Sequence, residues 1–194
     1  MSIGRPLEYG SEQVLDIAMG LFWRKGYEAT SLQDLVGEMG LSRSSFYSAF
    51  GSKRQLFLSC LQRYEEATAL DLTTRLHGAA TGRDFIEDTL LWAIEEATEG
   101  ADPKGCLVVN TANELAQRDK QVAAQVSQGF DKYRAIFLAA AIRGQEDGSV
   151  ANDKEATLLA NYLVTSMSGL RTMVKAGTDI EVLRDIVAMV VSAM

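Results

Sequence analysis

A row of small polar and basic side chains lies between two glycines near the N-terminus, Gly40 and Gly51. Helical spacing predicts that Phe46, Ala49 and Phe50 face inward. The outward set is then Arg43, Ser44, Ser45, Tyr47 and Ser48. An arginine can reach guanine edges or phosphate, serines let a helix approach a groove closely, and a tyrosine hydroxyl can donate to phosphate. This pattern is typical of a helix that reads DNA.

Further candidate DNA contacts flank this row. Lys53 begins the next predicted helix, where its charge and the free backbone N–H groups both suit a phosphate. Hydroxyl groups at the starts of the two short helices are expected to cap them and to reach DNA, from Thr30, Ser31 and Ser42. Arg5, in Gly4-Arg5-Pro6, gives the N-terminal arm one cation, and such arms enter an adjacent minor groove.

The elements that must position these residues are predicted to be helices. A first helix spans about 11–25, a second follows Ser31, and a third runs from Ser42 to Phe50. Gly40 supplies the tight turn that a helix-turn-helix needs. We therefore predict a DNA-binding domain over residues 1–54, linked by a helix of about 53–77 to a body of 55–194.

The rest of the chain predicts helices at about 83–98, 106–117, 120–144, 153–176 and 179–194. With only two prolines and long stretches that lack helix breakers, we expect an all-α protein: a three-helix head and a larger helical body. Both C-terminal segments carry apolar stripes, Leu158 to Met173 and Ile180 to Val191.

Charge and composition restrict the function. The formal net charge is -7, but residues 1–54 hold six basic and six acidic groups, so the body carries the whole excess. The acidic body would repel DNA, so that the head alone would bind it. No segment is long and apolar enough for a membrane span or a signal peptide, so we expect a cytosolic protein with free thiols at Cys60 and Cys106. No residue cluster has metal-ligand spacing, and we expect no metal and no cofactor.

The stretch from Val14 to Tyr64 resembles the DNA-binding head of the tetracycline-repressor-like (TetR) family. The matching positions include Gly26-Tyr27, Thr30-Ser31-Leu32, Gly40-Leu41-Ser42-Arg43, Phe46-Tyr47, Phe50, Lys53 and Leu56-Phe57. Val36 departs from the alanine that the family prefers, and Gly37 stands inside the second helix. The resemblance implies a homodimer that pairs through its last two helices, binds palindromic operator DNA, and is released when a small-molecule effector enters the body.

Candidate effector-binding residues come from the polar run and the aromatic residues of the body. Asn110 and Asn113 could line a pocket or face solvent, and large side chains could form walls or plain core: Trp92, Tyr133, Phe137, Tyr162 and Met167.

Cys106 is a second kind of candidate. It lies at the start of a predicted helix, near Lys104, where unpaired N–H groups favour a thiolate. Its Gly-Cys-Leu context resembles a branch of the family that includes electrophile-sensing repressors, and Lys175 matches a lysine of that branch. The alternative is a small buried hydrophobe.

Two other functions compete with a ligand-responsive repressor. One is a small helical ligand-binding protein or enzyme that uses the body cavity. Against it, the chain holds a single histidine, His77, and shows no nucleophile motif or convincing carboxylate pair. The other is a DNA-binding protein without an effector.

Overall fold

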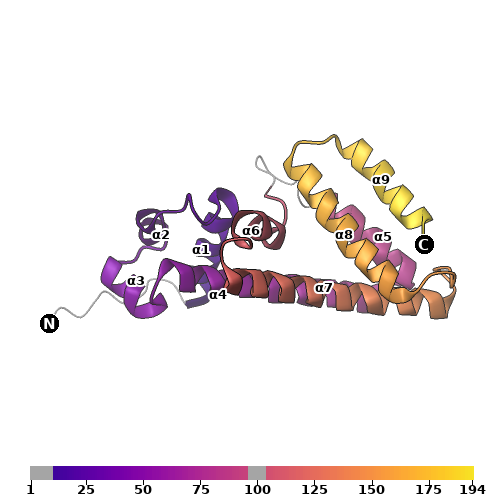
Figure 1. The fold of residues 1–194 in the computed structure, drawn as a ribbon, viewed down its shortest axis with the longest axis horizontal. Coiled ribbons are helices and arrows are strands. Elements are labelled where there is room, and N and C mark those ends of the chain that lie inside the picture. Colours follow the sequence, from indigo (N-terminus) through magenta and orange to yellow (C-terminus); the bar gives the residue numbers. More distant parts are fainter. Residues whose placement is uncertain (1–10, 96–103) are drawn as a thin grey trace.

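The computed structural model describes residues 11–95 and 104–194, and this part of the chain forms nine helices and no strand. Figure 1 shows an elongated molecule with α1–α3 at one end and α5, α8 and α9 at the other. Two long helices, α4 (Lys53–Gly78) and α7 (Lys120–Asp147), run side by side and join the two ends. The prediction of an all-α fold with an N-terminal helix-turn-helix is confirmed.

Local capping explains the three head helices, α1 (Ser11–Lys25), α2 (Leu32–Glu38) and α3 (Arg43–Phe50). Ser31 caps α2 in a reciprocal capping box with Asp34, and the Ser42 hydroxyl accepts from the Ser45 N–H at 3.0 Å. Gly40 adopts φ +65° in the turn between them, a conformation that favours glycine. The predicted helices of the head are confirmed.

Buried side chains fasten the head to α4. Phe22 of α1 meets Phe57 of α4 edge to face at 5.0 Å between ring centroids, and Phe46 of α3 is fully buried. Because α4 begins directly after α3 and continues into the body, a tilt of α4 must carry the head with it.

The body contains α5 (Gly82–Glu95), α8 (Ala156–Lys175) and α9 (Ile180–Ser192) around the far half of α4 and α7, whereas α6 (Leu107–Leu115) lies beside α1 near the start of α7. Helix α7 continues to Asp147, a few residues past the predicted end at about Gly144. Gly144 permits close packing: a Cβ there would lie 2.5 Å from Val150 Cγ2. The helix ends before Gly148, whose φ of +77° is a left-handed conformation that favours glycine.

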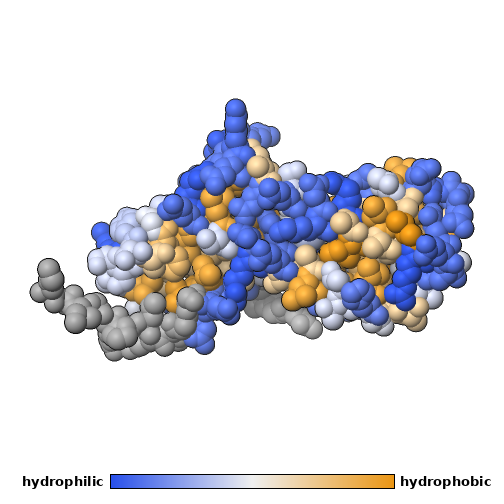
Figure 2. Space-filling model, turned by 90° about the horizontal axis from the view of Figure 1, so that it is seen from below, coloured by the Kyte–Doolittle hydropathy of each residue, from blue (hydrophilic) through white to orange (hydrophobic). Residues whose placement is uncertain are grey.

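Helices α8 and α9 each bury one face and expose another that is also apolar. The exposed side chains are Leu158, Tyr162 and Met173 of α8 and Val182, Ile186 and Met189 of α9. Seen from below, hydrophobic residues show at both ends of the molecule, the body end included, whereas the middle of that face is largely hydrophilic (Figure 2). Such exposed apolar surface needs a cover. Within the described residues, no helix is long and apolar enough to cross a membrane.

Candidate nucleic-acid interface and its connection to the body

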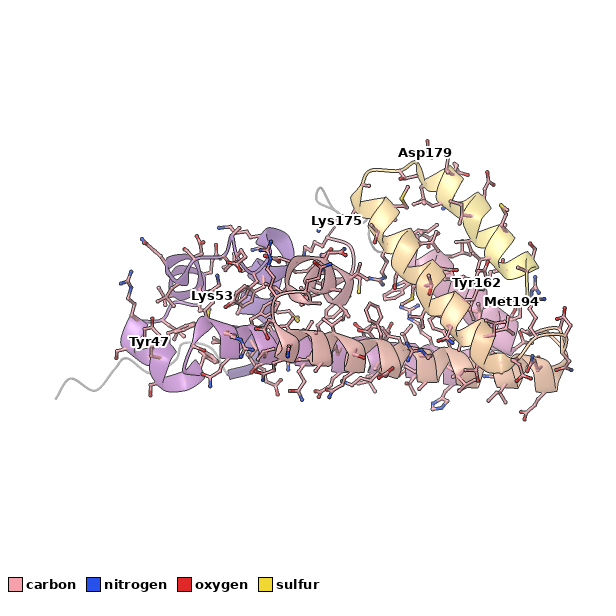
Figure 3. All side chains as sticks on the ribbon, viewed as in Figure 1. Tyr47, Lys53, Tyr162, Lys175, Asp179 and Met194 are labelled. Atoms are coloured by element: carbon pink, nitrogen blue, oxygen red, sulfur yellow. The ribbon has the colours of Figure 1, made fainter. Side chains whose placement is uncertain are left out.

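The exposed face of α3 lies at the head end of the molecule, where Figure 3 labels Tyr47. Arg43, Ser44 and Ser48 are exposed, and Tyr47 keeps 52 % of its surface accessible. Ser45 is half-buried, and its hydroxyl shares a 2.8 Å hydrogen bond with the Ser42 hydroxyl. The structure thus brings the predicted α3 residues together on one surface.

Four of the predictions for this surface need separate statements. Ala49 is exposed, so its predicted inward position is wrong. Thr30 is fully buried and its hydroxyl donates to the Gly26 carbonyl at 2.6 Å, so it braces the turn after α1 and does not reach the surface. Arg5 lies outside the described residues. Ser31 is exposed, but its hydroxyl is engaged with Asp34.

On and just after α3, two cations have no carboxylate partner among the described residues and are available for phosphate. Arg43 has no hydrogen bond or ion pair with any described residue. Lys53 has no carboxylate partner either, and its Nζ lies 4.3 Å from the centroid of the Tyr27 ring (Figure 3). Lys25, by contrast, pairs with Asp34 at 3.1 Å. A backbone N–H and the hydroxyl of Ser31, together with Lys25, lower the pKa of that carboxyl to about 2.

Arg54 ties the start of α4 to the start of α7. Its Nε and Nη2 each donate to one Asp119 oxygen at 2.9 Å, and Nη1 donates to Gln121 Oε1 at 2.8 Å. Asp119 is also the N-cap of α7, where it accepts from backbone N–H groups. A two-point arginine–carboxylate contact fixes direction as well as distance.

Helix α6 contacts the head through two further hydrogen-bonding groups. The Glu114 carboxylate accepts from the backbone N–H of Tyr27 at 3.0 Å and of Glu28 at 2.8 Å. Trp23 Nε1 donates to the Gly105 carbonyl at 3.1 Å, just before α6. Sequence reasoning missed these contacts, because their partners are more than 80 residues apart and no local pattern marks them.

The pH dependence of stability tests the Arg54–Asp119 contact. The hydrogen bonds from Arg54, followed by that from the Val122 N–H, hold the pKa of Asp119 at about 2, below its usual 3.8. A depressed carboxyl pKa contributes stability above the unfolded pKa and loses it as pH falls through the folded one. We expect Asp119→Asn to lower the melting temperature at pH 6, with the difference shrinking from pH 4 towards pH 2.

Thermal unfolding of both proteins across that range measures the difference. Asp34 titrates in the same window in both proteins, so it cancels from the comparison. A difference that stays constant from pH 6 to pH 2 would contradict the assignment.

The predicted effector-binding residues lie in different parts of the described structure. Tyr133, Phe137 and Met167 are buried in the body. Trp92 is half-buried, with the guanidinium carbons of Arg75 and Arg171 at 4.3 Å and 4.8 Å from its ring centroid.

Three other predicted effector residues lie elsewhere. Asn110 and Asn113 line a cleft between α1, α6 and α8. Tyr162 is exposed on the outer face of α8, so its prediction as a pocket wall is wrong. An apolar stripe along a helix does not by itself say which part of it meets the core.

Cys106 is the N-cap residue of α6 and is buried, and the Tyr64 hydroxyl donates to its sulfur at 3.7 Å. Lys175 Nζ donates to Asn110 Oδ1 at 3.1 Å. Cys60 is buried in α4, and burial raises the pKa of its thiol to about 12. In the described ranges, no three His, Cys, Asp or Glu side chains are grouped so that they could hold a metal ion.

Comparison with known proteins covers both parts of the chain. Residues 14–60 match the bacterial regulatory proteins of the tetR family, and residues 83–190 match the tetracyclin repressor-like C-terminal domain. The uncharacterized HTH-type transcriptional regulator YezE of Bacillus subtilis is 29 % identical over 184 residues, 94 % of this chain and 95 % of its own. The HTH-type transcriptional repressor ComR of Escherichia coli is 28 % identical over 186 residues, 95 % of this chain and 89 % of its own.

Solved structures share the fold. A cysteine-substituted form of the TetR-family regulator CifR, complexed with 26-base-pair operator DNA, superimposes with a TM-score of 0.86 at 30 % identity over 97 % of this chain and 99 % of that one. The reduced form of Escherichia coli NemR gives a TM-score of 0.85 at 23 % identity, over 92 % of this chain and 93 % of its own.

Proposed function

The chain belongs to the TetR family of bacterial regulatory proteins, and we propose that it is a ligand-responsive transcriptional repressor. It binds palindromic operator DNA as a homodimer, and a small-molecule effector releases it. The exposed face of α3, with Arg43, Tyr47 and Ser48 beside Lys53, carries the proposal. The relatives named as repressors and the operator complex of CifR support it.

The homodimer explains the exposed apolar faces of α8 and α9. A second copy seated on them would cover side chains such as Leu158 and Met189, which are 61 % and 71 % exposed. A two-fold dimer presents two recognition helices, and a palindromic operator presents two matching half-sites. We assign DNA binding to residues 1–54 and effector binding and dimerisation to residues 55–194.

The contacts between head and body supply a route for release. Glu114 joins the head to α6, and Arg54 joins it to the start of α7. Trp23 joins it to Gly105, the residue before Cys106. An effector that shifts α6 would therefore move the head, and the spacing of the two recognition helices would change. A ligand acts only through its different affinity for the two arrangements.

A gel-shift experiment with the DNA upstream of the gene tests the proposal. We expect a discrete shift at low salt that a specific competitor abolishes and an unrelated duplex does not. Absence of any shift at low salt would favour the alternative, a helical ligand-binding protein or enzyme. A shift that no body ligand modulates would favour a DNA-binding protein without an effector.

A thiol-based effector response is our proposal for Cys106. Its sulfur contacts Tyr64, whose ring meets Trp23 of the head at 5.0 Å between centroids. With an unsaturated carbonyl compound, the thiol would lose its proton and the sulfur would form a C–S bond to the β-carbon. The π bond between the α- and β-carbons would break, and its electron pair would take up a proton at the α-carbon. The added bulk in a buried site would displace Tyr64 and, through it, Trp23.

We expect N-ethylmaleimide to weaken operator binding of the unaltered protein about tenfold, because overpacking a core causes strain of the order of 1–3 kcal/mol. Operator binding of Cys106→Ser should be unaffected. Anisotropy of a labelled operator measures the response. Cys60→Ser is the matched control and should respond like the unaltered protein. If Cys106→Ser still releases DNA on treatment, Cys106 is packing only.

A further inference from the structure

A cleft of about 370 Å³ separates the head from the body on the side of α6. Its walls include Trp23, Arg24 and Lys25 of α1, Asn113 and Glu114 of α6, and Lys175 of α8. The volume is in the range of small-molecule sites, which often lie between domains. The cleft is separate from the α3 face and from the buried residues of the body core.

Hydrogen-bond donors outnumber free acceptors in this cleft. The single carboxylate, Glu114, already accepts from two backbone N–H groups of the turn after α1. Lys175 donates only to the neutral Asn110 side chain, and Arg24 has no ion pair with a described residue. Two cations without a carboxylate partner therefore share one cleft in a chain of net charge -7.

Asn110 and Asn113 complete the polar lining from α6. The Asn110 amide group donates to the Lys104 carbonyl at 2.9 Å and its oxygen accepts from Lys175, so the side chain is held in place. Asn113 is exposed, and its amide group has no hydrogen bond with another described residue. A neutral N–H donor beside two cations suits a carboxylate or phosphate oxygen.

We propose that this cleft binds a small organic dianion, of the phosphomonoester or dicarboxylate class, between Arg24 of the head and Lys175 of the body. This goes beyond the proposed repressor function, because it adds a second ligand site. That site lies between the head and the body, where an effector must act to move the head. A bound anion would restrain α1 against α6 and α8. By thermodynamic linkage, the bound anion changes the affinity of the protein for operator DNA. Operator DNA changes the affinity for the anion by the same factor.

Tryptophan fluorescence of the full chain tests the site. The chain holds two tryptophans, so in a Trp92→Phe protein only Trp23, a wall of the cleft, reports. The protein is titrated with inorganic phosphate and, separately, with succinate, at constant ionic strength against sodium chloride. We expect a saturable change with one of them and one bound anion per chain by calorimetry.

Substitutions locate the binding. Arg24→Met and Lys175→Met should each weaken anion binding about tenfold, since a hydrogen bond to a charged group contributes of the order of 1.5–3 kcal/mol. Lys53→Met, at the DNA-facing surface, is the matched control and should leave the affinity for the anion unchanged. Both cleft cations are exposed, and circular dichroism of each variant establishes that it is folded.

Three results would overturn the proposal. One is a response to both anions that equals the response to chloride. The second is binding that neither Arg24→Met nor Lys175→Met weakens. The third is binding that Lys53→Met abolishes, which would place the anion on the phosphate-contacting surface of the head. The gel shift with operator DNA is independent of all three, so a failure here leaves the repressor proposal standing.

Discussion

Replacing Arg43 with alanine is expected to weaken operator binding by about tenfold to a hundredfold, because a well-formed arginine contact with DNA contributes of the order of 1–3 kcal/mol. Arg43 is exposed at the start of α3 and has no partner among the described residues, so its loss should leave the head folded. Anisotropy at fixed salt, with the operator and with a scrambled duplex, measures the effect.

Comparison of the two duplexes separates base reading from phosphate contact. If Arg43 reaches a base edge, Arg43→Ala should weaken the operator complex more than the scrambled one. Lys53→Ala is the matched comparison: it should weaken both duplexes alike and lower the slope of log affinity against log salt by about one. An operator affinity that Arg43→Ala leaves unchanged would mean that α3 is not the recognition helix.

Introducing a charge at Ile186 is expected to abolish the dimer. Ile186 lies on the apolar outer face of α9 and is 38 % exposed in the single chain. An unpaired charge buried in an interface costs of the order of 3–5 kcal/mol, so Ile186→Glu should weaken dimerisation by a hundredfold or more. Operator affinity should fall with it, because a single head then binds one half-site.

Analytical ultracentrifugation across a concentration range measures the dissociation, and the labelled operator measures the second effect. Leu70→Glu is the control: Leu70 is an equally apolar side chain, 69 % exposed on α4, away from α8 and α9. It should leave the dimer intact. A dimeric Ile186→Glu protein, or a monomeric Leu70→Glu protein, would contradict the assignment of the interface to α8 and α9.

Two kinds of contact decide how the body can control the head. The shared helix α4 carries any tilt directly, whereas Glu114, Trp23 and Arg54 fix the angle at which the head leaves the body. Removing any one of the latter would leave the DNA-contacting residues in place. These three side chains lie outside the α3 face proposed to contact DNA, so we expect their loss to alter regulation more than operator recognition.

Local features followed from the amino-acid sequence alone. Ser31 and Ser42 cap the helices that follow them, because a serine hydroxyl reaches the N–H three residues on whatever the rest of the chain does. Gly40 makes the turn between those helices for an equally local reason, its positive φ. The helix-turn-helix, the exposure of Arg43, Ser44, Tyr47 and Ser48, and the all-α class followed from such short-range rules.

Which face of each helix meets which neighbour depends on the packing of the whole chain. Thr30 is polar and precedes a helix, yet the packing of the turn buries it. Tyr162 belongs to an apolar stripe, yet that part of the stripe faces outward. Glu114 reaches the turn after α1 across more than 80 residues. Pairings of this kind depend on the shape that all helices reach together, and no spacing within one helix encodes them.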